Sequence, residues 1–253
     1  MTEPLQRAQG RGHVANPVDE RARDDAPPAA QVRLRAMGEP DLGFVVEQHV
    51  RHFPEGFFAR LGRGFLREYY RAFLTSAAAR TTVAESEGRP VGYLVGVTTP
   101  AAHRQHVLDR HGPRLVAHAV ASMLLRPWLA ARFLRTRAGR YARKLLVARR
   151  SPQAPSSSGE GSVGVLTHVA VAPSAQSCGV GSKLVGGFER QAAEAGCDRL
   201  VLVTAAGEQG AGAFYRRRGW QALGEHRTPD RQLLSTYERV VDPGAGPDDA
   251  VEE

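Results

Sequence analysis

The chain of 253 residues has little cysteine and no long apolar run. Its two cysteines, Cys178 and Cys197, cannot build a disulfide framework, and no Cys/His set has the spacing of a zinc site, so no metal is expected. No stretch of eighteen apolar residues occurs, which argues against a membrane-spanning helix. The first residues lack the apolar core of a secretory signal. These absences together predict a globular protein of the reducing cytoplasm.

Acidic residues are scarce in one segment, which concentrates the positive charge of the chain. The net charge of the whole chain is +8. Residues 101–150 contain twelve Arg or Lys side chains and a single acid, Asp109, so this segment is strongly basic and the remainder carries a small net negative charge. Nucleic acid, an anionic membrane surface and an acidic substrate are all compatible partners, and a solvated arginine-rich helical face is the alternative.

Shifts in composition divide the chain into segments. Residues 1–30 are polar with little periodicity and residues 241–253 are acidic, so a disordered N-terminal arm and a disordered C-terminal tail are predicted. One domain is expected over 31–240. Within it, residues 101–150 are predicted to form a basic helical insert, and residues 151–162, rich in Pro, Ser and Gly, a flexible linker.

Hydrophobic periodicity predicts strands and helices in a definite order. The expected strands lie at 32–35, 81–84, 90–97, 163–171, 200–203, from 220 onward and at 233–240, and the expected helices at 40–52, 58–75, up to 195 and at 208–218. A strand–helix–strand unit after the insert favours a parallel crossover, and the hairpin before it makes the sheet mixed. The predicted fold class is therefore α/β (α+β), with a mixed central sheet flanked by helices and the helical insert between the third and fourth strands. The aromatic stripe at 58–74 is typical of a core and is alternatively the wall of a substrate site.

The loop after the strand Val163–Val171 carries the clearest motif. The sequence Gln176-Ser177-Cys178-Gly179-Val180-Gly181 opens the next helix, which continues through Ser182. A helix N-terminus presents unpaired backbone N–H groups and a positive dipole end, and glycine lets a ligand approach the backbone closely. This stretch therefore predicts a site for the pyrophosphate of a nucleotide-bearing cofactor.

Two motifs resemble those of the GNAT superfamily of acetyl-CoA-dependent N-acetyltransferases. The first is Gln176–Gly181, which follows a strand ending Val171-Ala172-Pro173, and the second is Phe214-Tyr215-Arg216-Arg217-Arg218-Gly219-Trp220. The resemblance covers about 163–240 and extends weakly back to 32. It implies the GNAT fold, acetyl-CoA as co-substrate and transfer of an acetyl group to an amine.

The resemblance also implies roles for individual residues. Backbone N–H groups of Ser177–Ser182 would bind the pyrophosphate, and Val169–Val171 would pair with the pantetheine arm as an added strand would. Tyr215 would lie near the sulfur and donate a proton to the leaving thiolate, and an aromatic side chain that only packs the cofactor is the alternative. The expected cofactor-binding residues are Val169, Ala170, Val171, Gln176, Ser177, Cys178, Gly179, Val180, Gly181, Ser182 and Phe214.

One position departs from the family pattern. The family often has Asn seven residues before the tyrosine, where this chain has Glu208. A carboxylate cannot donate a hydrogen bond as an amide does, so the usual cofactor contact is not expected from this side chain. Gln209 is the candidate replacement.

The attacking amine must be neutral, so a base or a water chain has to take its proton. His168 is the first candidate, because it precedes the cofactor strand residues, titrates in the useful range and should share a sheet face with Ala170. A structural histidine is the alternative interpretation. His52 and Glu55, between the first two helices, form a second candidate group or an ordinary loop surface. Cys178 has no visible base partner and is interpreted as a small residue beside the phosphates.

The predicted function is transfer of an acetyl group from acetyl-CoA to a primary amine, such as an amino sugar or another small metabolite, by direct attack in a ternary complex. The alternatives are a non-catalytic module that binds acyl-CoA or an anionic partner, and a protein N-acetyltransferase. The 101–150 insert is expected to form a lid or one wall of the acceptor site. Its histidines His103, His106, His111 and His118 are expected to be solvated. The sequence does not indicate an oligomeric state.

Overall fold

The computed structural model describes residues 32–54, 56–128, 131, 162–207, 210–228 and 232–241. The expected N-terminal arm, nearly all of the expected linker and C-terminal tail, and the insert beyond 128 except for position 131 lie outside these ranges. So do Glu55, Glu208 and Gln209. Among the described helices, none is long and apolar enough to cross a membrane.

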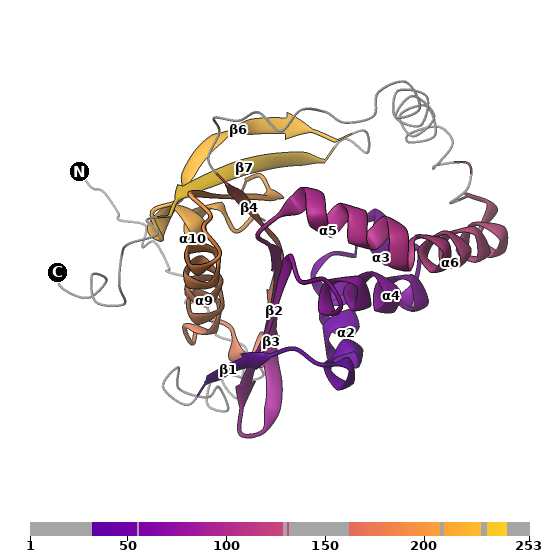
Figure 1. The fold of residues 1–253 in the computed structure, drawn as a ribbon, viewed down its shortest axis with the longest axis horizontal. Coiled ribbons are helices and arrows are strands. Elements are labelled where there is room, and N and C mark those ends of the chain that lie inside the picture. Colours follow the sequence, from indigo (N-terminus) through magenta and orange to yellow (C-terminus); the bar gives the residue numbers. More distant parts are fainter. Residues whose placement is uncertain are drawn as a thin grey trace, which may run out of the picture.

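The described strands form one seven-stranded sheet with the order β1-β2-β3-β4-β5-β7-β6 (Figure 1). They are β1 Arg33–Ala36, β2 Ala79–Ser86, β3 Arg89–Val97, β4 Val163–Val171, β5 Arg199–Ala205, β6 Gln221–Arg227 and β7 Leu233–Val240. Strands β4 and β5 are parallel, and the other neighbouring pairs are antiparallel. The predicted mixed sheet is therefore confirmed, with the insert between its third and fourth strands.

Helices cover both faces of this sheet (Figure 1). One layer contains η2 Glu39–Asp41, α2 Leu42–His52, α3 Phe57–Arg60, α4 Arg63–Leu74, α5 Pro100–His106, the π-helical segment η3 Val107–His111 and α6 Gly112–Leu125. The other layer contains α9 Val180–Glu194, which follows the short turn η5 Pro173–Ala175, and α10 Gly212–Arg217. Strands β3 and β4 run between the two layers, so a core forms on each side of them.

The core on the α9 side depends on close approach between helix and strands. Leu166 of β4 and Phe188 of α9 belong to it. A Cβ on Gly96 of β3 would lie 2.4 Å from the Phe188 ring, and one on Gly187 of α9 would lie 3.0 Å from Leu34 of β1. Helix–strand packing thus explains a glycine in the middle of α9, where glycine lowers helix propensity by roughly 1 kcal/mol relative to alanine.

The core on the other side is built around α4. Phe65, Leu66, Tyr70 and Phe73 of this helix are buried, whereas Tyr69 is half-buried. Most side chains of the aromatic stripe are therefore core, and Tyr69 reaches the candidate site described below. The interpretation of the stripe as a wall of a substrate site stays a prediction.

The insert packs one side against α4. Its His111 is 4% exposed, and the Nδ1 atom lies 2.8 Å from Oε1 of Glu68 on α4. His103 is 9% exposed, and its ring centroid lies 4.4 Å from that of Phe73. The expectation that the four histidines of the insert are solvated is therefore wrong for His103 and His111, because α5 and η3 turn both side chains toward α4.

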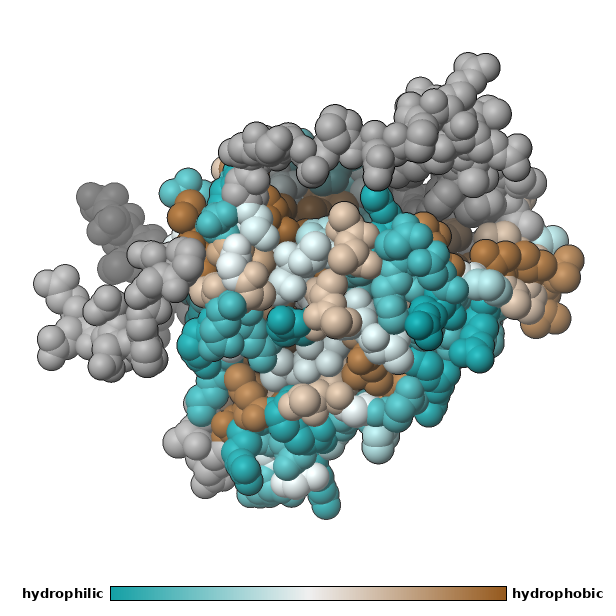
Figure 2. All heavy atoms as spheres, in the orientation of Figure 1, coloured by the Kyte–Doolittle hydropathy of each residue, from teal (hydrophilic) through white to brown (hydrophobic). Residues whose placement is uncertain are grey.

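The outer face of α6 is apolar and exposed. Val116, Val120 and Leu124 recur at four-residue spacing and are 62%, 49% and 78% exposed. Figure 2 shows apolar side chains gathered at this end of the molecule. The adjoining face of α6 places Met123 against the cluster that contains Leu61. The helix is thus anchored by one face and leaves an apolar stripe on the surface.

Candidate active site at the half-paired strand β4

A β-bulge in β4 decides which residues face the candidate site. Consecutive residues of β3 pair with His168 and with Leu166, so Thr167 is an extra residue in β4. Leu166 belongs to the core on the α9 side, whereas His168 contacts α2 and α4, and Ala170 belongs to the core on that side. The prediction that His168 and Ala170 share a face is confirmed, and the bulge is what directs that face toward α2.

Strands β4 and β5 are paired only at their beginning. The parallel register runs from Val163 opposite Arg199 to Leu166 opposite Leu202 and then ends. On its other edge β5 pairs with β7 over its whole length, and beyond Leu166 β4 keeps its pairing with β3. The other backbone edge of Thr167–Val171 has no strand partner among the described residues. An extended ligand arm can add to such an edge as a strand.

The loop after β4 ends in a helix N-terminus. Ser177 and Gly179 have positive φ angles of 62° and 75°, and Gly179 is the N-cap of α9. The first N–H groups of a helix have no partner within it, so this loop presents donors and a positive dipole end to an anion. The side-chain amide of Gln176 donates to the Val171 carbonyl at 3.1 Å, which fixes the loop to the end of β4.

The two sequence motifs meet at Gly181. A Cβ on this residue would lie 3.7 Å from the ring of Phe214 and 3.9 Å from the side chain of Val171. The first turn of α9, the helix α10 and the end of β4 therefore converge at one place. Helix N-terminal donors, an unpaired strand edge and a small residue beside an aromatic ring suit a phosphate-bearing cofactor with an extended arm.

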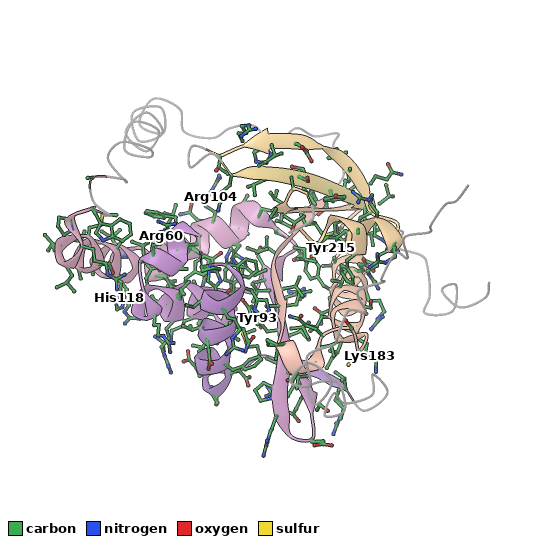
Figure 3. All side chains as sticks on the ribbon, turned by 180° about the vertical axis from the view of Figure 1, so that it is seen from behind. Arg60, Tyr93, Arg104, His118, Lys183 and Tyr215 are labelled. Carbon is green, nitrogen blue, oxygen red and sulfur yellow. The ribbon has the colours of Figure 1, made fainter. Side chains whose placement is uncertain are left out.

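Tyr215, the candidate proton donor, lies on the α9 side of the sheet. Its side chain is 3% exposed, and its ring packs with those of Phe214, Trp220 and Tyr237. Burial raises the pKa of Tyr215 above its ordinary value, so the phenol stays protonated at neutral pH. Figure 3 shows Tyr215 and Tyr93 on opposite sides of the central strands.

His168 lies against α2 and α4. Its Nε2 atom lies 3.2 Å from the hydroxyl oxygen of Tyr69, and its ring centroid lies 5.0 Å from that of His49 and 5.5 Å from that of Phe53. Burial, with a smaller contribution from His49, lowers the pKa of His168 to about 3. The imidazole is therefore neutral at pH 7, and the two catalytic candidates flank β4 from opposite sides.

His49 completes this side of the site, although the sequence analysis did not single it out. Its Nδ1 atom lies 2.6 Å from the hydroxyl of Tyr70, which lies 2.8 Å from the hydroxyl of Tyr93. The side chain is 2% exposed, and burial lowers its pKa to about 4. The sequence does indicate that His49 is buried, because it falls at helical spacing from Leu42 and Val46 on the apolar face of α2.

A pocket of about 260 Å³ opens beside the two imidazoles. It is lined by His49, Phe53, Gly56, Phe57, Phe58 and His168. These residues come from α2, from the loop that follows it, from the first turn of α3 and from β4. The loop after α2, the second candidate region predicted from the sequence, therefore contributes Phe53 and Gly56 to the pocket wall, and the start of α3 contributes Phe57 and Phe58.

Two other candidates lie outside this pocket. His52 connects α2 to the cofactor loop, since its Nε2 lies 3.3 Å from the side-chain amide of Gln176 and its Nδ1 lies 3.0 Å from the Gln48 carbonyl oxygen. Cys178 is half-buried, and its Sγ donates to the Gln176 carbonyl at 3.3 Å. Across the described part of the chain, no group of three or more His, Cys, Asp or Glu side chains has an arrangement that could hold a metal ion.

Known proteins share both the sequence pattern and the fold. The model of the acetyltransferase (GNAT) family matches residues 46–220. Ard1 from Thermoplasma volcanium has 14% identity and a TM-score of 0.51, over 83% of this chain and 98% of that chain. Ribosomal-protein-alanine N-acetyltransferase from Brucella melitensis has 15% identity and a TM-score of 0.50, over 82% and 99%. A mutant of SpeG spermidine N-acetyltransferase from Vibrio cholerae has 13% identity and a TM-score of 0.50, over 83% and 94%.

At these identities the solved structures show the fold alone. No curated protein matches the chain. The family model, however, spans well over half of the sequence and includes both motifs. The chain therefore belongs to the GNAT family and is an acyltransferase, of a family whose co-substrate is acetyl-CoA.

Proposed function

We propose that this enzyme moves an acetyl group from acetyl-CoA to a primary amine by direct attack in a ternary complex. The observation that carries the proposal is the bulged, half-paired strand β4. A helix N-terminus and an unpaired backbone edge lie on its donor side, and a pocket with two neutral imidazoles lies on its acceptor side. Such an arrangement lets donor and acceptor reach one strand from opposite sides, which removes much of the entropic cost of bringing them together.

The donor side is suited to acetyl-CoA by its hydrogen-bond donors and its open strand edge. Backbone N–H groups of Ser177–Ser182 would bind the pyrophosphate, and the free edge of Thr167–Val171 would bind the pantetheine arm. Phe214 would pack beside the cofactor next to Gly181. Bound acetyl-CoA supplies the activated acetyl thioester, and the chain orients it.

The acceptor side favours an uncharged amine. His49 and His168 each have one ring nitrogen at a tyrosine hydroxyl, which leaves the other ring nitrogen for a ligand. An environment that lowers the pKa of two imidazoles also lowers the pKa of an ammonium group, so a larger fraction of the amine is able to attack. The attacking nitrogen becomes strongly acidic as it forms its new bond, and His168 then accepts its proton.

Tyr215 is proposed to protonate the departing thiolate, because burial keeps its phenol protonated. We expect Tyr215→Phe to lower kcat by about 10²-fold or more. The Kd for acetyl-CoA should change little, because the ring still packs on Trp220. Rates of CoA release and calorimetric titration with acetyl-CoA check the two quantities. An unchanged kcat would remove the proposed role of Tyr215.

The function itself is tested by titrating acetyl-CoA calorimetrically and then following CoA release with a panel of amines. Binding together with amine-dependent release is expected, and no binding at millimolar acetyl-CoA contradicts the proposal. Binding without release for any amine would favour a non-catalytic acyl-CoA-binding module. Release only with peptide α-amines would favour a protein N-acetyltransferase.

A contact with an anionic partner is a separate proposal for the basic insert. Arg104, Arg110 and Arg114 are exposed on its described part, which also carries the apolar stripe of α6. Anionic lipid vesicles are the probe, because a basic and apolar helix face suits an anionic membrane surface. Binding that falls steeply with salt is expected, and no binding at low salt contradicts it. The cytoplasmic setting stays a prediction.

A further inference from the structure

The walls of the 260 Å³ pocket are aromatic. Phe53, Phe57 and Phe58 line it together with His49 and His168. The three phenylalanines are half-buried, so they are not sealed within a core. The Phe53 ring is held 5.1 Å from the ring of His49 and 5.5 Å from the ring of His168, centroid to centroid. A wall of this kind binds apolar or aromatic surface.

The pocket is large enough for a ring that carries a short chain. An apolar protein cavity of about 150 Å³ holds a benzene molecule. The volume here is about 260 Å³. The remaining space therefore accommodates the few carbon atoms that would join an aromatic ring to an amine.

The lining disfavours acceptors with more than one charge. None of the described residues that line the pocket is a carboxylate. Against the described lining, the second ammonium group of a polyamine would therefore lose its hydration without gaining a counter-ion. A monoamine does not have this cost, because its single nitrogen can be neutral when it binds.

The lining also disfavours acceptors with many hydroxyl groups. Among the described residues of the lining, the polar side-chain atoms are the ring nitrogens of His49 and His168, and one nitrogen of each already faces a tyrosine hydroxyl. The hydroxyls of an amino sugar would compete for the two remaining nitrogens, and unpaired buried hydroxyls lower affinity. Two nitrogens suffice to position one amine.

We propose that the acceptor is a hydrophobic primary monoamine, an arylalkylamine or alkylamine, whose apolar part lies against the three phenylalanines and whose nitrogen lies between the two imidazoles. The inference rests on the proposed function and narrows its acceptor. In the reaction the amine nitrogen forms a bond to the acetyl carbon and the thioester C–S bond breaks. The amine loses one proton to His168, and the thiolate gains one from Tyr215. The imidazolium then releases its proton to water and the phenolate takes one up from water, so both side chains return to their starting state. The products are a neutral amide and free CoA.

The test compares kcat/KM across amines at saturating acetyl-CoA, with CoA release as the readout. The panel is 2-phenylethylamine, hexylamine, glucosamine, spermidine and a peptide with an N-terminal alanine. We expect the first two to exceed glucosamine and spermidine by about tenfold or more, the size of effect that differential pocket contacts produce. Faster turnover of glucosamine, spermidine or the peptide overturns the inference and leaves the proposed function intact.

A variant of the wall tests the contact itself. Phe57→Ala is expected to raise KM for 2-phenylethylamine about tenfold with little change in kcat or in the Kd for acetyl-CoA, because it removes binding surface only on the acceptor side. Phe57→Leu restores apolar volume and should recover most of that loss. Trp128→Ala is the matched control, since Trp128 is an aromatic residue of the insert that is 53% exposed, and it should leave KM unchanged. If Phe57→Ala raised KM by the same factor for every amine in the panel, the proposed contact between Phe57 and the apolar part of the acceptor would be overturned.

Binding measurements distinguish failure of the inference about the acceptor from failure of the proposed acetyltransferase function. Calorimetric titration of 2-phenylethylamine into enzyme saturated with CoA should show binding, and no binding overturns the inference. If acetyl-CoA binds and other amines are acetylated but hydrophobic amines are not, only the inference fails. If acetyl-CoA does not bind, or if no amine is acetylated, the proposed function fails and the inference fails with it.

Discussion

At the scale of the residue, the two imidazoles of the pocket are distinguished by being neutral throughout the physiological pH range. Burial lowers the pKa of His49 to about 4 and that of His168 to about 3. Neither imidazole is protonated in the resting enzyme at neutral pH, but each can transiently accept a proton from the amine nitrogen, which becomes acidic during attack. The acid limb of the pH–rate profile is therefore expected to follow the amine and to show no inflection near 6.5.

Replacing His168 tests its role as proton acceptor. His168→Gln is expected to lower kcat by about 10²-fold or more without changing the Kd for acetyl-CoA, because the backbone edge of β4 is kept. His226→Gln is the matched control, since His226 is exposed on β6, and should keep the parental rate. Initial rates of CoA release at saturating substrates measure the effect. A kcat of His168→Gln close to that of the unmodified enzyme would show a structural histidine instead.

The buried His49 predicts a loss of stability in acid. Its pKa is lower in the folded state, about 4, than the ordinary 6.5. Between these values the unfolded chain binds more protons, so the free energy of unfolding falls as pH falls, by up to about 3 kcal/mol. Denaturant unfolding at pH 7 and pH 4.5 measures the drop. His49→Gln should reduce this pH dependence, and an unreduced drop would place its origin elsewhere.

Among the elements, strand β4 determines the geometry of the site, because it contains a β-bulge at Thr167. Thr167 is an ordinary strand residue, and nothing in the local pattern marks it as the extra residue of a bulge. The alternation of strand residues therefore predicted that His168 and Ala170 share a face of the sheet, but it did not predict that this face is the one covered by α2 and α4. The burial of His49 was readable from the helix period of α2, whereas its contact with Tyr70 depends on how α2 packs on α4.

The first turn of α9 predicts opposite effects for two glycines of one motif. Gly179 has a φ of 75°, so Gly179→Ala is expected to lower the free energy of unfolding by about 1 kcal/mol. Gly181 lies within the helix, and an added Cβ would meet its nearest neighbour at an ordinary 3.7 Å. Gly181→Ala should therefore keep or raise stability. Urea unfolding of the two variants decides this, and equal losses would contradict the assigned backbone conformations.

At the scale of the whole molecule, the order of elements was largely predictable and their arrangement in space was not. Periodicity and turns predicted the strands, because each strand is encoded by its own residues. The position of β7 between β5 and β6 depends on pairing between distant segments. The packing of the insert could not be predicted for the same reason, because His111 of η3 contacts Glu68 of α4 and these two segments lie far apart in sequence.

The pocket also combines segments that no local pattern connects. Its lining comes from α2, the loop after it, the first turn of α3 and β4. The resemblance to the GNAT family therefore predicted the donor side, where one continuous motif supplies the loop and helix start. The acceptor side was left open between several amine classes because its walls assemble only in the folded chain.

Transfer of the acetyl group from acetyl-CoA to an amine through this site can be followed with an isotopic label. The enzyme is incubated with acetyl-CoA that carries a deuterated acetyl group and with each of the five amines of the panel, and the masses of the products are measured by mass spectrometry. A labelled N-acetyl amine is expected, and it should form much more slowly with His168→Gln. Recovery of every amine unlabelled, from an enzyme that binds acetyl-CoA, would contradict it.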